Sequence, residues 1–460
     1  MNSLFIYTSV LVVYLGLLVL IGVVMGRRLR SAEDFYIGGR NIGAWVTALS
    51  FVAAYFSSVV IVGGGGFGYK FGLSTLWIGA INVFLGCTLC WIVMGRRLRE
   101  ITQRLNTMTI PEFLYKKYNS REAQVFSAMV IVIFMIVYNV SILKGMGHIF
   151  EGLMNMPYAW GVLLSGVIII IYVAIGGYLA VVWTGAFQAV VMGAALVLLT
   201  VFTLKHTGGL SHAVLSLERI NPGYVETPGV WGWGGLLSFA LIVSFGVWGM
   251  PQMVIRFYSI KNVDVLRIGT VLVTLGGSMA LLPYLNGAIS RVLFPSLPSS
   301  DLAIPTLTRH VLSDLGGAIF LSGVIAAGMS TFSSVLIIIS SSLVRDVMRV
   351  EGERAIFLNR IWSAVAGIVS LLIALKPPAL ILVLCAFAWA VIASVTLWPI
   401  LFGIYKEKVK KNACLVSMGG GFLTSLIWMA AKNPWKIHGF IPGILVGLLL
   451  FVMVDTLSRD

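Results

Sequence analysis

Long apolar runs alternate with short polar segments along the whole chain. A run of about 20 apolar residues is long enough to cross a bilayer as a helix, and the sequence contains about 13 such runs. They lie at residues 4–25, 43–69, 76–95, 125–148, 158–178, 183–204, 234–254, 266–290, 314–344, 360–375, 379–404, 412–431 and 440–456. This pattern predicts an all-α, polytopic membrane protein whose main partner is the lipid bilayer.

The composition agrees with that prediction. Of the 460 residues 59% are hydrophobic and only 11% are charged, which is more apolar surface than one soluble core buries. The formal net charge of +15 does not indicate nucleic-acid binding, because the basic residues fall in short clusters between apolar runs rather than on one basic face with stacking aromatics.

The basic clusters predict the orientation of the chain. Clusters at residues 26–30, 95–100, 115–118, 344–360 and 405–411 all fall on one side of the predicted membrane. That side and the C-terminal tail hold 23 of the 32 Lys and Arg residues. Because cytoplasmic loops carry an excess of Lys and Arg, we expect the N-terminus outside and the C-terminus in the cytoplasm of a bacterial or archaeal plasma membrane.

Acidic residues are missing from the middle of every predicted span. All 17 Asp and Glu residues map to loops or span ends, and the five histidines are scattered. A proton-coupled transporter usually needs a titratable group at membrane depth, and a hydrolytic or metal-dependent enzyme needs a cluster of such groups. The sequence therefore indicates no enzyme, no catalytic residue and no metal centre other than a site for an alkali cation.

Neutral oxygens offer such a site. Ala327, Ser330 and Thr331 lie at i, i+3 and i+4 and share one helix face. If the second span breaks within residues 53–58, freed backbone carbonyls can complete an oxygen site opposite that face. In the alternative interpretation, these hydroxyls only bond back to their own helix. The glycines at 63–66 predict either an adaptable half-helix or close helix packing.

The second and seventh spans are both interrupted by glycine, and each opens a set of five spans. Interrupted helices at matching positions of two halves are typical of inverted-repeat transporters. The chain also resembles the sodium/solute symporter family over nearly its full length. The resemblance rests on FYIGGRNIGAW (35–45), GFGYKFG (66–72), AIGGYLAVVWTGAFQAVVM (174–192), GMPQMVIRFYS (249–259), AAGMSTFSS (326–334) and LWPILFGIY (397–405). Within that family, SFGVWGMP (244–251), KPPALILVLCAFAW (376–389) and HGFIPGILV (438–446) are most similar to the pantothenate-type branch.

This resemblance implies a LeuT-like fold with a five-plus-five inverted-repeat core. A single transporter domain, 1–460, would comprise an extra helix at 4–25, repeats at 43–204 and 234–404, and two final helices at 412–456. Its sodium ligands would be the backbone oxygens of Ala53, Phe56 and Ala327 with the hydroxyls of Ser330 and Thr331. Many members carry Asp where this chain has Gly185, after Trp183 and Thr184. The departure favours one co-transported sodium ion rather than two.

The resemblance also implies a solute site between the interrupted spans. Its candidate residues are Tyr55, Ser58, Trp77, Asn82, Tyr138, Lys144, Ser244, Trp248 and Phe387. Membrane Trp and Tyr often lie in interfacial belts instead, and Lys144 can either bind an anion or extend to the interface. Proline-type members carry aromatics where this chain has Val243 and Val247. With no acid in the predicted cavity, an anionic solute is favoured over an amine.

We therefore expect a sodium-coupled importer of a small carboxylate, such as pantothenate or a short monocarboxylate, that works by alternating access. Two alternatives remain open. The same fold can carry a sugar, sialic acid or an amino acid such as proline, since Asn82, Asn139 and Gln252 provide polar groups. The chain can also be a membrane sensor domain that acts through a separate signalling partner.

Overall fold

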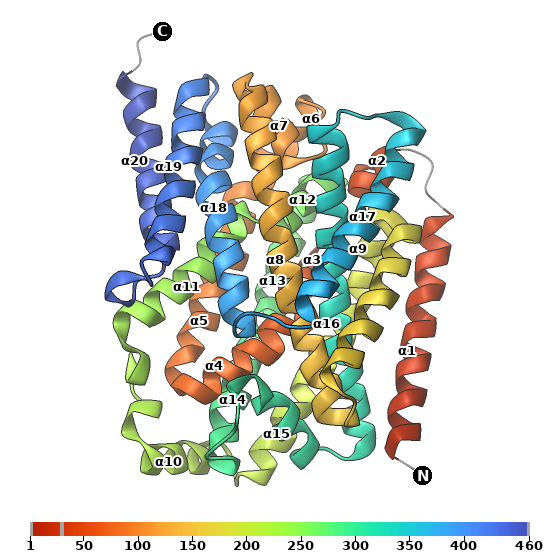
Figure 1. The fold of residues 1–460 in the computed structure, drawn as a ribbon, viewed down its shortest axis with the longest axis vertical. Helices are drawn as coiled ribbons and strands as arrows, with labels where there is room; N and C mark the ends of the chain where they lie inside the picture. Colours follow the sequence, from red (N-terminus) through yellow and green to blue (C-terminus); the bar gives the residue numbers. More distant parts are fainter. Residues whose placement is uncertain (1–2, 28–31, 458–460) are drawn as a thin grey trace.

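The computed structural model describes residues 3–27 and 32–457, and its helices pack along a common long axis (Figure 1). In that part of the chain, 11 helices are long and apolar enough to cross a membrane. A further pair, Ala44–Tyr55 and Val59–Phe71, forms one span bent by 51°, and Tyr158–Ile171 is a shorter apolar helix. Together these segments account for every apolar run that the sequence predicts.

Elements written η are short 3-10 or π-helical stretches. Up to residue 206 the chain forms α1 (Ser3–Gly26), α2 (Ala32–Ile37), η1 (Gly38–Arg40), α3 (Ala44–Tyr55), η2 (Val59–Gly63), α4 (Gly64–Phe71), η3 (Leu73–Thr75), α5 (Leu76–Ile81), η4 (Asn82–Leu89), α6 (Cys90–Arg104), α7 (Ile110–Tyr118), α8 (Arg121–Met154) and α9 (Tyr158–His206). Helix α9 combines two predicted spans, and Gly177 separates them with a backbone conformation of φ 59° and ψ −173° that glycine adopts readily.

The rest of the chain forms a second series of helices. It forms α10 (Leu210–Ile220), η5 (Pro222–Tyr224), η6 (Gly229–Trp231), α11 (Gly232–Gly249), α12 (Pro251–Ser259), α13 (Val265–Ser278), α14 (Leu281–Leu293), η7 (Ser300–Leu302), α15 (Ala303–Val311), α16 (Asp314–Ser341), η8 (Ser342–Val347), α17 (Gly352–Ala374), α18 (Ile381–Tyr405), α19 (Lys411–Ala430), η9 (Pro434–Lys436) and α20 (Phe440–Leu457). Helix α11 ends at Gly249 and α12 starts at Pro251, so the seventh predicted span is interrupted as the glycine pattern predicts.

Helix α16 lies at the centre of the molecule. Its apolar window is buried along its whole length, and it packs against α1, α3, α8, α9 and α17. A helix enclosed on all sides needs no polar face toward water or lipid. Its Ser and Thr side chains therefore point only at other parts of the protein.

The two ends of the molecule differ. One end carries α2, α7 and the end of α20, and the opposite end carries α10, α15 and the start of α1 (Figure 1). The first end contains the basic segments at 96–104, 115–121 and 345–349, and we call it the basic end. The described termini lie at opposite ends, as an odd number of crossings requires.

The glycine run packs one helix closely against another. A Cβ atom on Gly68 would collide with the carbonyl oxygen of Tyr284, and one on Gly287 would collide with that of Gly65. The backbones of α4 and α14 therefore touch, which only residues without a side chain allow. Of the two interpretations of residues 63–66, the structure supports close helix packing.

Candidate functional site

Helix α3 ends in the middle of the bundle and leaves carbonyl groups without helical partners. The amide of Ser57 would bond to the Ala53 carbonyl in a continuous helix, but it donates to the carbonyl of Tyr55 at 3.1 Å. The helix ends at this point, and Phe56 is the first residue beyond it. The carbonyls of the last helical turn are thereby free to bind another donor or a cation.

Helix α16 supplies hydroxyl groups to these carbonyls. Ser330 Oγ donates to the Ala53 carbonyl at 2.8 Å, and Thr331 Oγ1 donates to the Ala54 carbonyl at 3.0 Å. The Ala327 carbonyl oxygen lies 2.9 Å from Ser330 Oγ and 3.2 Å from Thr331 Oγ1. All of these residues are buried. The group offers several neutral oxygens and no carboxylate, which suits a hard monovalent cation.

The structure thus brings together four of the five sodium ligands expected from the sequence, namely Ala53, Ala327, Ser330 and Thr331. Phe56 lies at the break itself, and its ring meets the Tyr55 ring edge-on at 5.7 Å. The Ala54 carbonyl is an additional member that we did not predict. The sequence could have indicated the Ala54 carbonyl, because a break that frees the Ala53 carbonyl also frees the next one.

A second break has the same construction. Met250 is extended (φ −79°, ψ 119°) between α11 and α12. The amide of Met253 donates to the Met250 carbonyl rather than to the Gly249 carbonyl. Instead, Thr396 Oγ1 of α18 donates to the Gly249 carbonyl at 2.8 Å. In both halves, a broken helix is therefore joined to a neighbouring helix by a hydroxyl group.

Several predicted solute residues meet around the Val243 carbonyl. Tyr55 Oη donates to this oxygen at 3.3 Å and Asn82 Nδ2 donates to it at 2.5 Å. The next residue, Ser244, packs against Gly86 of η4. Trp248 Nε1 donates to the Leu85 carbonyl at 3.0 Å. Helices α3 and α11 and the η4 segment therefore converge beside the first break.

Trp389 of α18 joins this group, although the sequence did not single it out. Its ring lies 6.1 Å from the Tyr55 ring and 5.8 Å from the Tyr138 ring. Its buried Nε1 makes no well-formed hydrogen bond within the described part of the chain. Its sequence signals were its place at the end of the 376–389 motif and its position two residues after Phe387. Tryptophan in an apolar span is too common to identify a site.

Four other predicted solute residues lie elsewhere or are engaged by the fold. Trp77 is 52% exposed and donates to the Thr227 hydroxyl at 3.2 Å. Ser58 Oγ donates to the Ile142 carbonyl, and the Phe387 ring packs on Phe134 at 5.5 Å. The ammonium group of Lys144 lies 3.0 Å from Asp301 Oδ2.

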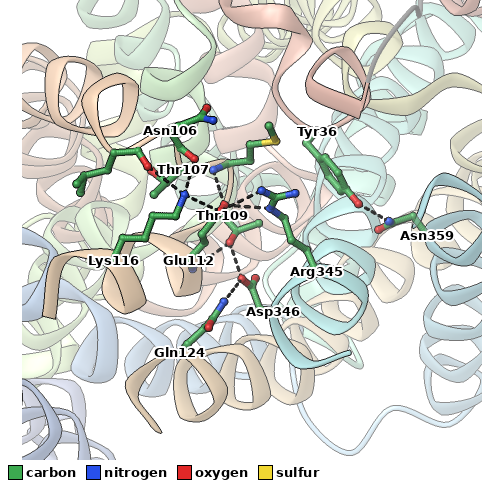
Figure 2. Close-up of polar contacts among 12 residues, drawn as sticks. Tyr36, Asn106, Thr107, Thr109, Glu112, Lys116, Gln124, Arg345, Asp346 and Asn359 are labelled. Atoms are coloured by element: carbon green, nitrogen blue, oxygen red, sulfur yellow. Dashed lines mark hydrogen bonds and ion pairs between the residues drawn. The ribbon is translucent and has the colours of Figure 1, made fainter. Parts of the chain in front are cut away.

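A polar network closes the bundle at the basic end (Figure 2). Asp346, at the end of η8, is fully buried and accepts hydrogen bonds from Thr109 Oγ1 and Gln124 Nε2, both at 2.9 Å. Its neighbour Arg345 donates to both carboxylate oxygens of Glu112 at 3.0 Å. The end of the α16 and η8 segment is thus bound to α7 and α8.

The same network caps α7. Thr109 Oγ1 accepts from the Glu112 amide at 3.1 Å, as in the first half of a T-x-x-E capping box, and Glu112 Oε2 accepts at 2.8 Å from the amide of Met108, one residue before the cap. Burial of Glu112 raises the pKa of its carboxyl, but Arg345, the Met108 amide and Lys116 together outweigh this effect and hold the pKa below its usual range. We missed this network because acids at span ends suggest solvated positions.

The relatives of this chain are transporters. It is 30% identical to the sodium/pantothenate symporter of Escherichia coli (strain K12), over 92% of this chain and 89% of that protein. It is also 30% identical to the high-affinity proline transporter PutP of Bacillus subtilis (strain 168), over 96% of each chain.

Solved structures share the fold. A Na+-coupled sialic acid symporter in a substrate-bound, outward-open state matches with a TM-score of 0.85 and 18% identity, over 99% of this chain and 98% of that one. Mhp1, a nucleobase-cation-symport-1 family transporter, matches with a TM-score of 0.62 and 13% identity, over 93% and 96% of the two chains. The sequence profile described as "Sodium:solute symporter family" matches residues 35–421. The chain therefore belongs to the sodium:solute symporter family.

Proposed function

We propose that this protein is a sodium-coupled importer of a small organic solute with a carboxylate group, such as pantothenate or a short monocarboxylate. Sodium is the co-transported ion of the family to which the chain belongs. The identity of the solute and the residues that bind each species are the proposed parts.

The observation that supports the sodium site is the meeting of freed carbonyls and hydroxyls between α3 and α16. We assign sodium to the carbonyls of Ala53, Phe56 and Ala327 and the hydroxyls of Ser330 and Thr331. The hydroxyl hydrogen atoms now point at carbonyls. A bound ion would take the oxygen lone pairs and bridge the two helices in place of these hydrogen bonds. Sodium binding would therefore order the first break.

The solute would bind beside that break, against Tyr55, Asn82, Tyr138, Ser244 and Trp248. Within the described residues, no Asp or Glu side chain contacts this group. An ammonium group would find no counter-charge there, whereas a carboxylate can accept a hydrogen bond from Nε1 of Trp389, which makes no well-formed hydrogen bond in the described part of the chain. Lys144 is best assigned to the fold, because Asp301 neutralises it.

Proline is the second candidate solute. The chain is as similar to a proline transporter as to a pantothenate symporter, and proline also carries a carboxylate. The two candidates differ at the nitrogen, because the amine of proline is charged and the amide of pantothenate is not.

For direction, we propose that the basic end faces the cytoplasm, which places the N-terminus outside the plasma membrane. One sodium ion entering with a monoanion is electroneutral, and with a zwitterion it moves one positive charge. In the second case the membrane potential contributes about 2.3 kcal/mol per 100 mV.

Uptake into proteoliposomes tests the proposal. Labelled pantothenate, acetate, pyruvate, proline and glucose would be offered with and without an inward sodium gradient. We expect sodium-driven accumulation of one carboxylate, abolished by Ser330→Ala/Thr331→Ala. A Trp389→Phe variant keeps an aromatic ring, although a smaller one, and removes the N–H group, so it should weaken solute affinity more than sodium affinity. Uptake at the same rate with and without the sodium gradient, or accumulation of glucose alone, would overturn the proposal.

A further inference from the structure

Arg256 is a buried cation without a carboxylate partner. Its side chain is 1% exposed. Its guanidinium donates to the Gln252 carbonyl one turn earlier in α12 and, from Nη2, to Ser334 Oγ at 3.1 Å. The Tyr178 ring lies 6.0 Å away. Within residues 3–27 and 32–457, no Asp or Glu lies within ion-pair distance of this guanidinium.

This arrangement is unfavourable for folding alone. Arginine stays protonated in proteins, and a buried charge without a partner is strongly destabilising, whereas an apolar replacement of similar size is often neutral or stabilising. The bonds to one carbonyl and one hydroxyl offset only part of that penalty. A side chain with this cost indicates a role other than stability.

Ser334, the hydrogen-bond partner of Arg256 on α16, stands one helical turn from the proposed sodium ligand Ser330. Ser334 Oγ, which accepts from the guanidinium, donates to the Ser330 carbonyl at 2.8 Å. The Ser330 hydroxyl in turn contacts the Ala53 carbonyl. Ser334 follows Ser330 along α16 toward the basic end, and α12 lies in that half of the molecule (Figure 1). The fixed charge is therefore on the basic-end side of the sodium site.

We propose that Arg256 is a fixed cation that repels sodium from the site between α3 and α16. This inference rests on the proposed sodium site and adds a control of its affinity. Like charges repel more strongly inside a protein than in water. The guanidinium weakens sodium binding to a level at which the ion, once the basic end opens, leaves quickly into a compartment of low sodium concentration. The charge itself is needed, rather than the shape of the side chain.

The test is equilibrium binding of radioactive sodium to purified protein in detergent, together with uptake in proteoliposomes. Arg256→Met and Arg256→Gln remove the charge, and Arg256→Lys keeps it. We expect both neutral variants to bind sodium on the order of tenfold more tightly than the wild type. Their maximal uptake rate should fall, because sodium release slows. Arg256→Lys should retain an affinity within about threefold of the wild type.

Two outcomes would overturn this role. Neutral variants with wild-type or weaker sodium affinity would refute it, and so would a lysine variant that behaves like the neutral ones. Thermal unfolding without sodium is a second measurement, in which Arg256→Met should melt at or above the wild-type temperature. A large drop would mean that the guanidinium stabilises the fold, contrary to the proposal.

The Ser330→Ala/Thr331→Ala variant separates this inference from the proposed site. If it binds sodium like the wild type, the assignment of the site is wrong. If it loses sodium while the Arg256 variants bind like the wild type, the site stands and the role of Arg256 is refuted.

Discussion

Ser330 Oγ donates a hydrogen bond to the Ala53 carbonyl at 2.8 Å, although the two residues are 277 positions apart in the chain. The bond joins the central helix α16 to the broken end of α3. Any ion held by the same two oxygens must bridge these helices. If sodium binds at the proposed site, its binding and release are linked directly to the distance between α3 and α16.

The first prediction concerns these hydroxyls. Ser330→Ala and Thr331→Ala each remove one of the proposed sodium ligands, and bonds to a charged species contribute about 1.5 to 3 kcal/mol. Each single variant should raise the sodium concentration for half-maximal uptake about 10- to 100-fold. The double variant should lose sodium stimulation. Initial uptake rates at graded sodium concentrations measure the effect.

The matched control is Ser322→Ala. This serine lies on the same helix, and its hydroxyl donates only to the Ala318 carbonyl within that helix. Its removal should leave the sodium dependence unchanged. Equal shifts for the control and the test variants would show that general loosening of α16, rather than ligand loss, alters the response.

The sequence predicted this part of the structure well, for a physical reason. A 3.6-residue period fixes which hydroxyls share a face, and a span rich in glycine and hydroxyl groups indicates an interruption. The positions of Ala327, Ser330 and Thr331 needed only local geometry. The helices also follow from hydrophobicity alone, since the bilayer sets their length.

Contacts between distant segments were beyond such reasoning. Asp346 and Glu112 look like ordinary loop acids, yet the fold buries both. Arg256 is buried without a carboxylate partner because of the way α12 packs against α16, and no local sequence pattern specifies that packing. Trp389 reaches Tyr55 and Tyr138 from α18, where no polar residue next to position 389 indicated a site. Such positions require knowledge of which helices are neighbours.

The second prediction distinguishes two roles of Lys144. Asp301 lies 3.0 Å from its ammonium group and both side chains are largely buried. Asp301 also accepts from the Ile381 amide at 3.4 Å. Removing one partner of a buried pair costs about 3 to 5 kcal/mol, because the other charge stays buried. Lys144→Met and Asp301→Asn should each reduce folded yield and uptake.

The double variant Lys144→Met/Asp301→Asn should recover most of the folded yield and most of the uptake. Thermal unfolding and uptake of the identified solute would be measured for all three proteins. If Lys144 instead binds the solute carboxylate, the double variant would fold but still fail to transport.

The third prediction concerns stoichiometry. Simultaneous measurement of labelled sodium and solute fluxes should give one sodium ion per solute. A Cβ atom on Gly185 would lie at ordinary contact distance, 3.4 Å from Ser50 Cβ and 4.0 Å from Ala53 Cβ. Gly185→Asp would thus place a carboxylate beside α3. It should lower the half-saturating sodium concentration about tenfold, whereas the neutral Gly185→Asn should not. A wild-type ratio of two would contradict the prediction.

The last prediction concerns the network at the basic end. The pKa of Glu112 is lowered in the folded protein, because Arg345, the Met108 amide and Lys116 together outweigh the burial of the carboxyl. Its contribution to stability is therefore complete above the unfolded glutamate pKa of about 4.3 and is lost as the pH falls through the lower folded value. Glu112→Gln should reduce the free energy of unfolding by about 1.5 to 3 kcal/mol at pH 7.

At acidic pH the two proteins should become equally stable, because wild-type Glu112 is then protonated as well. Thermal unfolding in detergent between pH 7 and about pH 3 would show the convergence. Glu100→Gln is the control, since Glu100 pairs with Arg96 on an exposed surface and such pairs contribute about 0 to 1 kcal/mol. A Glu112→Gln deficit that is the same at every pH would mean that the side-chain packing, not its charge, matters. Convergence would instead show that the charge of Glu112, through its pairing with Arg345, stabilises the end of the α16 and η8 segment.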